Sequence, residues 1–458
     1  MPHNELGDCV QKVFILTFDN TYRITRHIKR SIRELILFFC FAILMYMYFF
    51  SSVNVVSNRA QLYGSVIVMI ATIFSVAGKP KRIKWNKSIL YPLIGFAVGI
   101  LLISLLHSVG EGYIIYAIDL IAIFPAFYFV WANRGDYETL LRLLSSATLF
   151  LGEISFVYCF YLAINGDLVV LGSRVAGIRA NPNTFGRLGV IVVLASLFLL
   201  LISIKKKPVM ISASFGLGIG LSYVLLSASR TSLLATAICI VTFAISLVKE
   251  YRKLTTGRLL LIFLLAALSS IILLVGLQLN DIDFRAKQKE KEVAVQLEKD
   301  AANPQSSKEN TDEKEIISSR IKQPGNINTI SSGRVNIWKL YWEHSSVLGS
   351  EYEEIKDFLP KKETYWAHNN ILEYIFRFGY IVGFIYAIYF VIQGCNGITI
   401  LFNKNFSSAV AYFTTAAIGI FSLIAMLDVA VLPFAGCIPC IYYLSITPII
   451  VCEERNGG

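Results

Sequence analysis

Arginine stands at several points of this sequence where long apolar stretches end. The arginines in question are, in chain order, Arg174, Arg179, Arg187 and Arg230. Arginine presents a planar fork of donors that binds phosphate oxygens in pairs and stays charged at any physiological pH. Two or three such groups could hold a diphosphate and stabilise the negative charge that grows on it as it leaves. The arrangement predicts a site for diphosphate chemistry.

A histidine occupies a comparable place later in the chain. His368, followed by Asn369, directly precedes the apolar run 370–393. An imidazole titrates near neutrality, so it could take the proton of an attacking hydroxyl group. The same position would also suit a helix cap, and a single arginine at a membrane surface is often only an anchor. No acidic metal-binding motif accompanies these residues, so we predict a site without a metal.

The elements that must position these residues are membrane-spanning helices. Apolar residues make up 55% of the 458 residues and only 16% are charged, against roughly 25% in soluble domains. About twelve apolar stretches approach the roughly 20 residues that cross a bilayer. They are 35–50, 61–78, 88–107, 113–132, 140–164, 184–203, 208–227, 231–248, 258–278, 370–393, 407–428 and 431–451. This pattern predicts an all-α polytopic membrane protein.

The basic residues between these spans predict the orientation of the chain. The connections 79–87, 205–207 and 249–258 carry five, three and four Lys or Arg residues, whereas the alternate connections carry few. Basic connections remain in the cytoplasm. We therefore place the tails 1–34 and 452–458 in the cytoplasm, the first with room for a short interfacial helix, and the candidate site on the outer face. The net charge of +11 has this origin and does not indicate nucleic-acid binding.

One segment outside the membrane is long enough to fold. Residues 279–367 connect the ninth and tenth spans, so the chain divides into spans one to nine over 35–278, this outer loop, and spans ten to twelve over 368–451. The part 281–323 is rich in Lys, Glu, Gln and Asn, which predicts a mobile or charged helical stretch. From about residue 330 aromatic and apolar residues return at helical spacing. We expect a short helical cap there, packed on the membrane domain.

Four segments of this chain resemble the signatures of the O-antigen ligase and polymerase family. They are RVAGIRANPN from Arg174, SASRTSLLA from Ser227, SGRVNIW from Ser332 and HNNILEYIFRFGYIVG from His368. The resemblance covers about residues 170 to 385, and the motif of His, Asn and a glycine ten residues further on is its most specific part. One departure is that Gly383 follows Gly379 by four residues and not by three, which affects helix packing there and leaves the histidine in place.

The resemblance implies a fold and a reaction. The family has the membrane architecture of C-type glycosyltransferases, with an active site under one large periplasmic loop in the bacterial inner membrane. Its members use undecaprenyl-diphosphate-linked glycans, and catalysis is attributed to outer-face arginines and a histidine, without metal and with inversion at the anomeric carbon. Carried over to this chain, the catalytic residues are His368, Arg230 and Arg174, with Arg179 as an alternative to Arg174.

The resemblance and the outer-face position together suggest further binding residues. The substrate-binding candidates are Arg179, Arg187, Arg334, Trp338 and Asn369. Of these, Arg334 and Trp338 match a Gly-Arg-x3-Trp pattern, and they could either shape the acceptor side or fix the cap.

Other polar residues have predicted structural roles. Asn181, Pro182 and Asn183 are expected to end the outer loop and cap the sixth span. Glu373 and Arg377, four residues apart on one span, are expected to form an ion pair within the membrane. We interpret three further carboxylates in apolar runs as similar buried partners; they are Asp119, Glu153 and Asp428.

Three functions agree with these features. A polymerase would join glycan repeat units carried on undecaprenyl diphosphate, together with a possible chain-length regulator, whereas a ligase would deliver the finished polysaccharide to lipid A-core. The loop 279–367 carries 14 Lys and Arg against 16 Asp and Glu, and a loop that receives the acidic core should be basic, so we favour the polymerase. The third candidate, a flippase or transporter, commonly has two similar halves and a site near the midplane. No cofactor is expected, and the partners are lipid-linked glycan, an acceptor glycan or lipid A-core, and membrane lipid.

Overall fold

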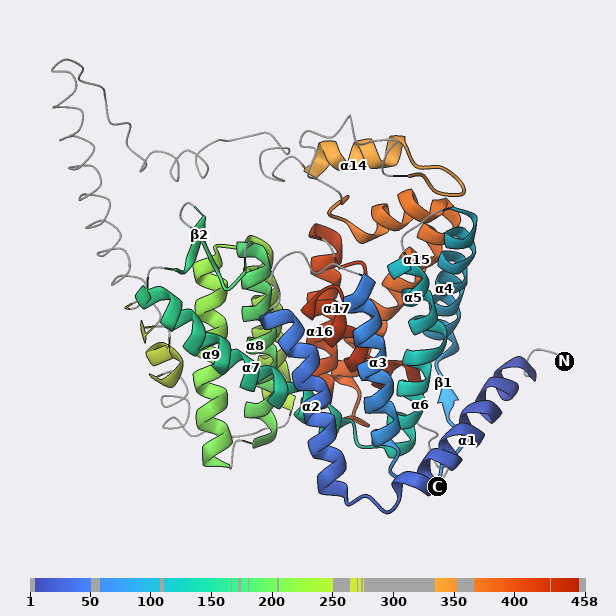
Figure 1. Ribbon diagram of the computed structural model, residues 1–458, viewed down its shortest axis with the longest axis horizontal. Helices are drawn as coiled ribbons and strands as arrows, with labels where there is room; N and C mark the ends of the chain where they lie inside the picture. The colour runs from blue at the N-terminus through green and yellow to red at the C-terminus, as the bar shows by residue number, and fades with distance from the viewer. Residues whose placement is uncertain are drawn as a thin grey trace.

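The computed structural model is mostly helical (Figure 1). It describes residues 5–50, 58–107, 111–165, 167–171, 174–179, 181–203, 206–249, 264–269, 271–272, 275, 334–351, 366–428 and 430–452. Its helices are α1 (Glu5–Thr25), α2 (Arg30–Phe49), α3 (Asn58–Ser75), α4 (Lys87–Leu106), α5 (Glu111–Ile118), the π-helix η1 (Asp119–Ile123), α6 (Phe124–Arg134), α7 (Tyr137–Asn165), α8 (Pro182–Ser203), α9 (Lys207–Ser227), α10 (Arg230–Lys249), α14 (Arg334–Glu343), α15 (Asn370–Phe402), α16 (Ser408–Leu427), α17 (Cys437–Ser445) and α18 (Thr447–Ile450).

The chain is a multi-pass membrane protein. Within the described residues, nine helical segments are long and apolar enough to cross a bilayer. They are α2, α4, the continuous run α5–η1–α6, α7, α8, α9, α10, α15 and α16. The predicted span 61–78 is a shorter apolar helix, α3, and most of the predicted span 258–278 lies outside the described residues, as does the predicted charged stretch 281–323. The prediction of an all-α membrane protein is therefore confirmed, while the predicted count of twelve spans is not reached by these residues.

The last predicted span, 431–451, is not one helix. An irregular stretch over 430–436 is followed by the nine-residue helix α17 and the four-residue helix α18. Nine residues reach about 13 Å, less than half of a hydrocarbon layer of roughly 30 Å. Pro448 explains the second break, because proline lacks an N–H and collides with the preceding helical turn.

Side chains of neighbouring helices satisfy the backbone of this irregular stretch. The Asn370 amide exchanges two hydrogen bonds with the backbone of Ala430, at 2.9 and 3.0 Å. The Phe434 N–H donates to Gln61 Oε1 at 3.1 Å, and the Tyr374 hydroxyl donates to the Val431 carbonyl at 2.5 Å. Irregular backbone at membrane depth is tolerated only where protein covers it in this way. The segment is thus a built part of the core.

Two short strands define one end of the bundle. β1 (Lys84–Trp85) pairs antiparallel with β4 (Val451–Cys452). The basic connection 79–87 and the C-terminal segment therefore lie at the same end, as the charge pattern predicts. Helix α1, within the predicted tail 1–34, packs at this end too, with Phe18 in a small apolar cluster. Helix α14 covers the opposite end, above α15 (Figure 1).

Helix α15 is interrupted where α14 and its following loop dock. Gly379 has φ 84° and ψ 167° inside the helix, a conformation open essentially only to glycine. The interruption frees backbone groups, and the loop after α14 binds them. The Ser350 N–H donates to the Phe376 carbonyl at 2.7 Å, and the Tyr380 N–H donates to the Ser346 carbonyl at 3.2 Å. This contact fixes α14 and the loop after it to the helix whose N-terminus follows His368.

Candidate functional site

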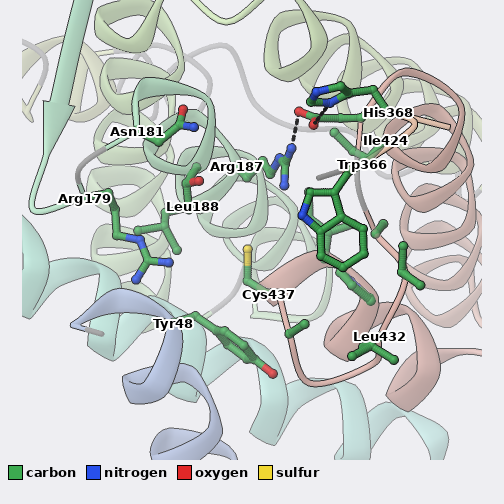
Figure 2. A pocket seen from close by; sticks show the side chains of 18 residues that line it. Tyr48, Arg179, Asn181, Arg187, Leu188, Trp366, His368, Ile424, Leu432 and Cys437 are labelled. Carbon is green, nitrogen blue, oxygen red and sulfur yellow. Dashed lines mark hydrogen bonds and ion pairs between the residues drawn. The ribbon is translucent and has the colours of Figure 1, made fainter. Parts of the chain in front are cut away.

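A cavity of about 310 Å³ opens at the end of the bundle that carries α14. Among the described residues its polar lining includes Arg179, Arg187, Trp366, His368 and Asp428. The rest of the lining is mainly apolar and includes Tyr48, Leu188, Leu432, Cys437 and Ile438. Figure 2 shows His368 and Arg187 on one side of the cavity and Tyr48 and Leu432 on the other. Three residues predicted from the sequence, Arg179, Arg187 and His368, thus share one cavity.

In the turn before α15, Asn369 caps the helix and His368 does not. Asn369 is the N-cap of α15, because its side chain accepts a hydrogen bond from the Leu372 N–H at 3.1 Å. His368 has φ 52°, which is uncommon for residues other than glycine and clusters at functional sites. Glu373 fixes the turn by accepting from the Ala367 N–H at 2.8 Å. Asn369, predicted to bind substrate, is therefore buried as a cap, and the His368 side chain lines the cavity.

His368 belongs to a chain of three charged or titratable groups. Its Nδ1 lies 3.2 Å from Oδ1 of Asp428, and Arg187 pairs with the other carboxylate oxygen (Figure 2). Burial would raise the pKa of Asp428, but Arg187 and His368 together hold that pKa below its usual range. An ionised carboxylate only accepts hydrogen bonds, so Nδ1 of His368 carries the proton and donates. Nε2 is then the basic nitrogen of the ring.

The N-terminus of α8 brings two arginines to the cavity. Asn181 accepts from the Asn183 N–H at 2.8 Å and Pro182 is the first residue of the helix, which confirms the predicted cap. Arg187 lies on this helix and Arg179 directly before it. Burial lowers the pKa of Arg179, and the neighbouring charge of Arg187 acts in the same direction. Two guanidinium groups on one cavity favour an anionic ligand.

Arg174 lies beside the cavity and supports its walls. It starts β3 (Arg174–Gly177), which pairs with β2 (Val169–Leu171). Its Nε donates to the Ser227 carbonyl at 2.8 Å, and Nη2 donates to Asn183 Oδ1 at 2.6 Å. These bonds join the C-terminus of α9 to the N-terminus of α8. Its contacts therefore place it next to the arginine site without making it a lining residue.

Arg230 lies at the start of α10, after a turn that packs against α8. A Cβ atom at Gly186 would lie 2.5 Å from Ser227 Oγ and 2.7 Å from Ser232 Oγ, so any larger residue would have to displace both hydroxyl groups. The turn thereby lies beside the residue that precedes Arg187. The Arg230 side chain is exposed and lies outside the described cavity lining. The structure gathers Arg174, Arg187 and the Arg230 turn in one neighbourhood and places only Arg187 in the cavity.

Arg334 and Trp338 belong to the cap helix α14. Arg334 donates to the Leu427 carbonyl, one residue before Asp428. On the same helix, Tyr341 packs on Phe376 of α15 with ring centroids 4.8 Å apart. Neither Arg334 nor Trp338 is among the described lining residues. The contacts of Arg334 match the predicted role of fixing the cap, and its alternative role toward the acceptor stays a prediction.

The predicted buried carboxylates fall into two groups. Glu373 pairs with Arg377, and Asp428 pairs with Arg187, as expected. Asp119 instead accepts from Gln61 Nε2 at 2.5 Å. Glu153 likewise accepts from Ser212 Oγ at 2.7 Å. The expected ion pairs at Asp119 and Glu153 are wrong for the part of the chain that the structure describes, because neutral side chains of adjacent helices occupy those positions.

Two residues of the site were missed as site residues. Asp428 was expected only as a buried partner, because nothing local links it to a histidine 60 residues away. Trp366 was not singled out, although it stands two residues before His368 and lines the same cavity. Its position two residues before a candidate base was the feature of the sequence that could have identified it as a site residue.

The chain matches no protein-family model and no curated protein. Its function must therefore be argued from the chemistry of this cavity.

Proposed function

We propose that this protein is a metal-independent, inverting glycosyltransferase. It moves an undecaprenyl-diphosphate-linked glycan onto an acceptor sugar at the periplasmic face of the bacterial inner membrane, as an O-antigen repeat-unit polymerase. The observation that carries the proposal is His368, oriented by Asp428 and Arg187, in a cavity that also contains Arg179. The proposed architecture is that of the C-type glycosyltransferases with about twelve crossings, of which the broken segment 430–451 makes the last.

The arrangement supplies each part of a glycosyl transfer. Nε2 of His368 takes the proton of the acceptor hydroxyl, and the hydroxyl oxygen forms a bond to the anomeric carbon. The bond from that carbon to the diphosphate oxygen breaks, and its electron pair leaves on undecaprenyl diphosphate. Arg187 and Arg179 stabilise the negative charge of this leaving group. Attack from the face opposite the diphosphate inverts the anomeric carbon.

The residues beside the cavity have supporting roles in this proposal. Arg230, exposed at the start of α10, binds the diphosphate as the donor enters. Arg174 holds the connection between α8 and α9 in place and thereby positions Arg187. Arg334 and Trp338 keep α14 over the site, where the acceptor glycan arrives.

The choice of polymerase over ligase rests on the acidic balance of residues 279–367. A ligase would receive the phosphorylated, acidic lipid A-core, which a basic loop would favour. The two functions share the same donor chemistry and differ in the acceptor, so one experiment separates them.

The test uses purified full-length protein in lipid nanodiscs with a synthetic undecaprenyl-diphosphate oligosaccharide and EDTA. We expect products that grow by whole repeat units, with an inverted new linkage by NMR. Transfer only when lipid A-core is added would identify a ligase. Loss of transfer on adding EDTA, restored by a divalent cation, would contradict metal independence. Movement of the lipid-linked glycan across the proteoliposome membrane without any new linkage would show that the protein is a transporter and not a glycosyltransferase.

A further inference from the structure

Trp366 is a half-buried tryptophan that lines the cavity next to the candidate base. The Arg377 guanidinium lies over its ring, 5.2 Å from the centroid. Arg377 is itself paired with Glu373, which also accepts from the Ala367 N–H at 2.8 Å. The indole is therefore fixed from behind by a charged network that also holds the turn of His368.

A second tryptophan shows what a purely structural arrangement looks like in this protein. Trp131 also carries an arginine over its ring, with Arg134 4.8 Å from the centroid, but its side chain is 0% exposed. Trp366 differs because part of its surface remains open to the cavity. Packing alone accounts for Trp131, whereas the open indole surface of Trp366 calls for a ligand.

The polar edge of Trp366 is also available. Figure 2 shows the indole nitrogen directed into the cavity, toward the side on which Arg187 lies. The indole N–H of Trp366 has no hydrogen-bond partner among the residues that the structure describes. Tryptophan N–H groups in proteins usually have a partner when they are buried. Here the N–H can donate to a group that enters the cavity.

We infer that Trp366 forms a sugar subsite that holds the pyranose ring attached to the diphosphate of the donor. A pyranose has an apolar face of C–H groups and an edge of hydroxyls, and a flat indole with a free N–H complements both. Ile424 and Leu432 extend the apolar surface on which the ring would lie. The indole lines the same cavity as His368 and Arg187 (Figure 2), so a sugar held on it lies within the space that the base and the diphosphate-binding arginine share. This inference rests on the proposed function and names the donor's first sugar as what the site recognises.

A kinetic test separates sugar binding from a structural role. The variants are Trp366→Phe, which keeps a flat ring and loses the N–H, and Trp366→Ala, which loses both. Trp342→Phe is the matched control, because Trp342 lies exposed on α14 outside the described cavity lining. Base stacking on aromatic side chains suggests that Trp366→Ala raises the donor KM about tenfold or more, with a smaller change in kcat. Trp366→Phe should lie in between. A fall in kcat with unchanged donor KM would overturn the subsite.

A binding test keeps the inference separate from the proposed reaction. Binding of undecaprenyl diphosphate and of undecaprenyl-diphosphate N-acetylglucosamine is measured by calorimetry on the His368→Asn variant. We expect the sugar-bearing lipid to bind more tightly, and the added Trp366→Ala change to remove that preference while plain lipid diphosphate binds as before. An unchanged preference, or no preference at the start, would overturn the subsite. The wild-type protein could also transfer no sugar while its variants show a binding preference that depends on Trp366. In that case the proposed transferase is wrong and the sugar subsite is retained.

Discussion

Two groups of charged residues lie at opposite ends of the bundle and differ in what they face. The α1-end cluster joins three arginines to two carboxylates; its members are Arg30, Glu34, Arg134, Asp136 and Arg142. Each carboxylate there is shared between arginines, at distances of 2.7 to 3.9 Å. The site cluster consists of Arg179, Arg187, Trp366, His368 and Asp428, which all line the cavity. The ion pair between Arg187 and Asp428 lines a cavity of about 310 Å³, and Asp428 also contacts the imidazole of His368.

The comparison shows why charge at a membrane face is not by itself evidence of a site. Each cluster contains a largely buried arginine, Arg134 or Arg187, paired with a carboxylate. Near each pair a tryptophan lies under a guanidinium. In the α1-end cluster these groups bind one another, which suits an anchor of α2, α6 and α7. In the site cluster a proton acceptor and a tryptophan surface remain directed to a cavity. The following predictions test this difference.

The largest effect is expected for the base. His368→Asn removes the proton acceptor while Asn369 still caps α15, so the protein should insert and fold normally. General base catalysis is typically worth 10²–10⁴-fold, and we expect transfer to fall at least a hundredfold in the nanodisc assay. His27→Asn, an exposed histidine near the start of α2, is the matched control and should keep full activity. Full activity of His368→Asn would remove the base assignment.

The next effect concerns the carboxylate that orients the base. Asp428→Asn cannot bind the N–H of His368 as a charged acceptor, so the ring loses its preferred tautomer. We expect transfer to fall by roughly 10- to 100-fold, the loss that is typical when a carboxylate that orients a metal-bound histidine is replaced. The double variant with His368→Asn should be no worse than His368→Asn alone, because the two residues act as a unit. Additive losses would show that Asp428 acts independently.

The pH dependence follows from the same pair. A lowered pKa keeps Asp428 ionised, so its stabilising contribution is present above the ordinary pKa of aspartate and is lost only as the pH falls through the lowered value. Between pH 5 and 8 the carboxylate should therefore not titrate. An infrared difference spectrum in this range should show no protonated carboxyl band that Asp428→Asn removes. Appearance of such a band between pH 5 and 8 would contradict the ionised state of Asp428.

A moderate effect is expected for the arginine outside the cavity lining. Arg230→Lys keeps the positive charge and loses the paired donors, so we expect about a tenfold loss of transfer with normal insertion. Arg142→Lys, in the α1-end cluster, is the matched control and should transfer normally. Polysaccharide length on gels from cells that carry each variant measures the difference. Near-normal polysaccharide with Arg230→Ala would remove Arg230 from diphosphate binding.

Gly379→Ala is expected to act on stability first. Alanine there would adopt a backbone conformation open essentially only to glycine, which costs about 1–3 kcal/mol, and its Cβ would collide with the Val347 carbonyl. The melting temperature in detergent should fall, and transfer should fall with it because the cap loosens near His368. Gly394→Ala, on the same helix with nothing within 4 Å of its Cβ, should melt like the wild type. Equal melting of both variants would show that the interruption of α15 is not fixed by glycine.

The smallest effect is expected in the α1-end cluster. Arg142→Gln removes one of several arginines on Glu34, and its side chain is 41% exposed. Partly exposed pairs of this kind are worth about 0–1 kcal/mol, so the melting temperature should change little. Transfer should stay within about twofold of wild type, since no group of this cluster faces the cavity around His368. A loss comparable to that of Arg230→Lys would mean that the two ends do not differ as proposed.

Local chemistry along the chain determined much of this protein. The membrane-spanning character follows from runs of apolar residues, and the Asn181 cap and the Glu373–Arg377 pair follow from residues within four positions of each other. Their partners are fixed by helix geometry, so the sequence alone was sufficient. The same holds for the proximity of Arg179 and Arg187, which flank one helix start.

Tertiary structure decided the pairings between distant segments. The partner of His368 is 60 residues away, and only the packing of α16 beside the start of α15 and α8 selects Asp428 for both His368 and Arg187. The same packing leaves Arg174 and Arg230 beside the cavity and Trp366 within it. It also breaks the last apolar run, because neighbouring side chains satisfy its backbone and remove the need for a continuous helix. Hydrophobicity and charge act along the chain, whereas a site depends on which helix ends meet.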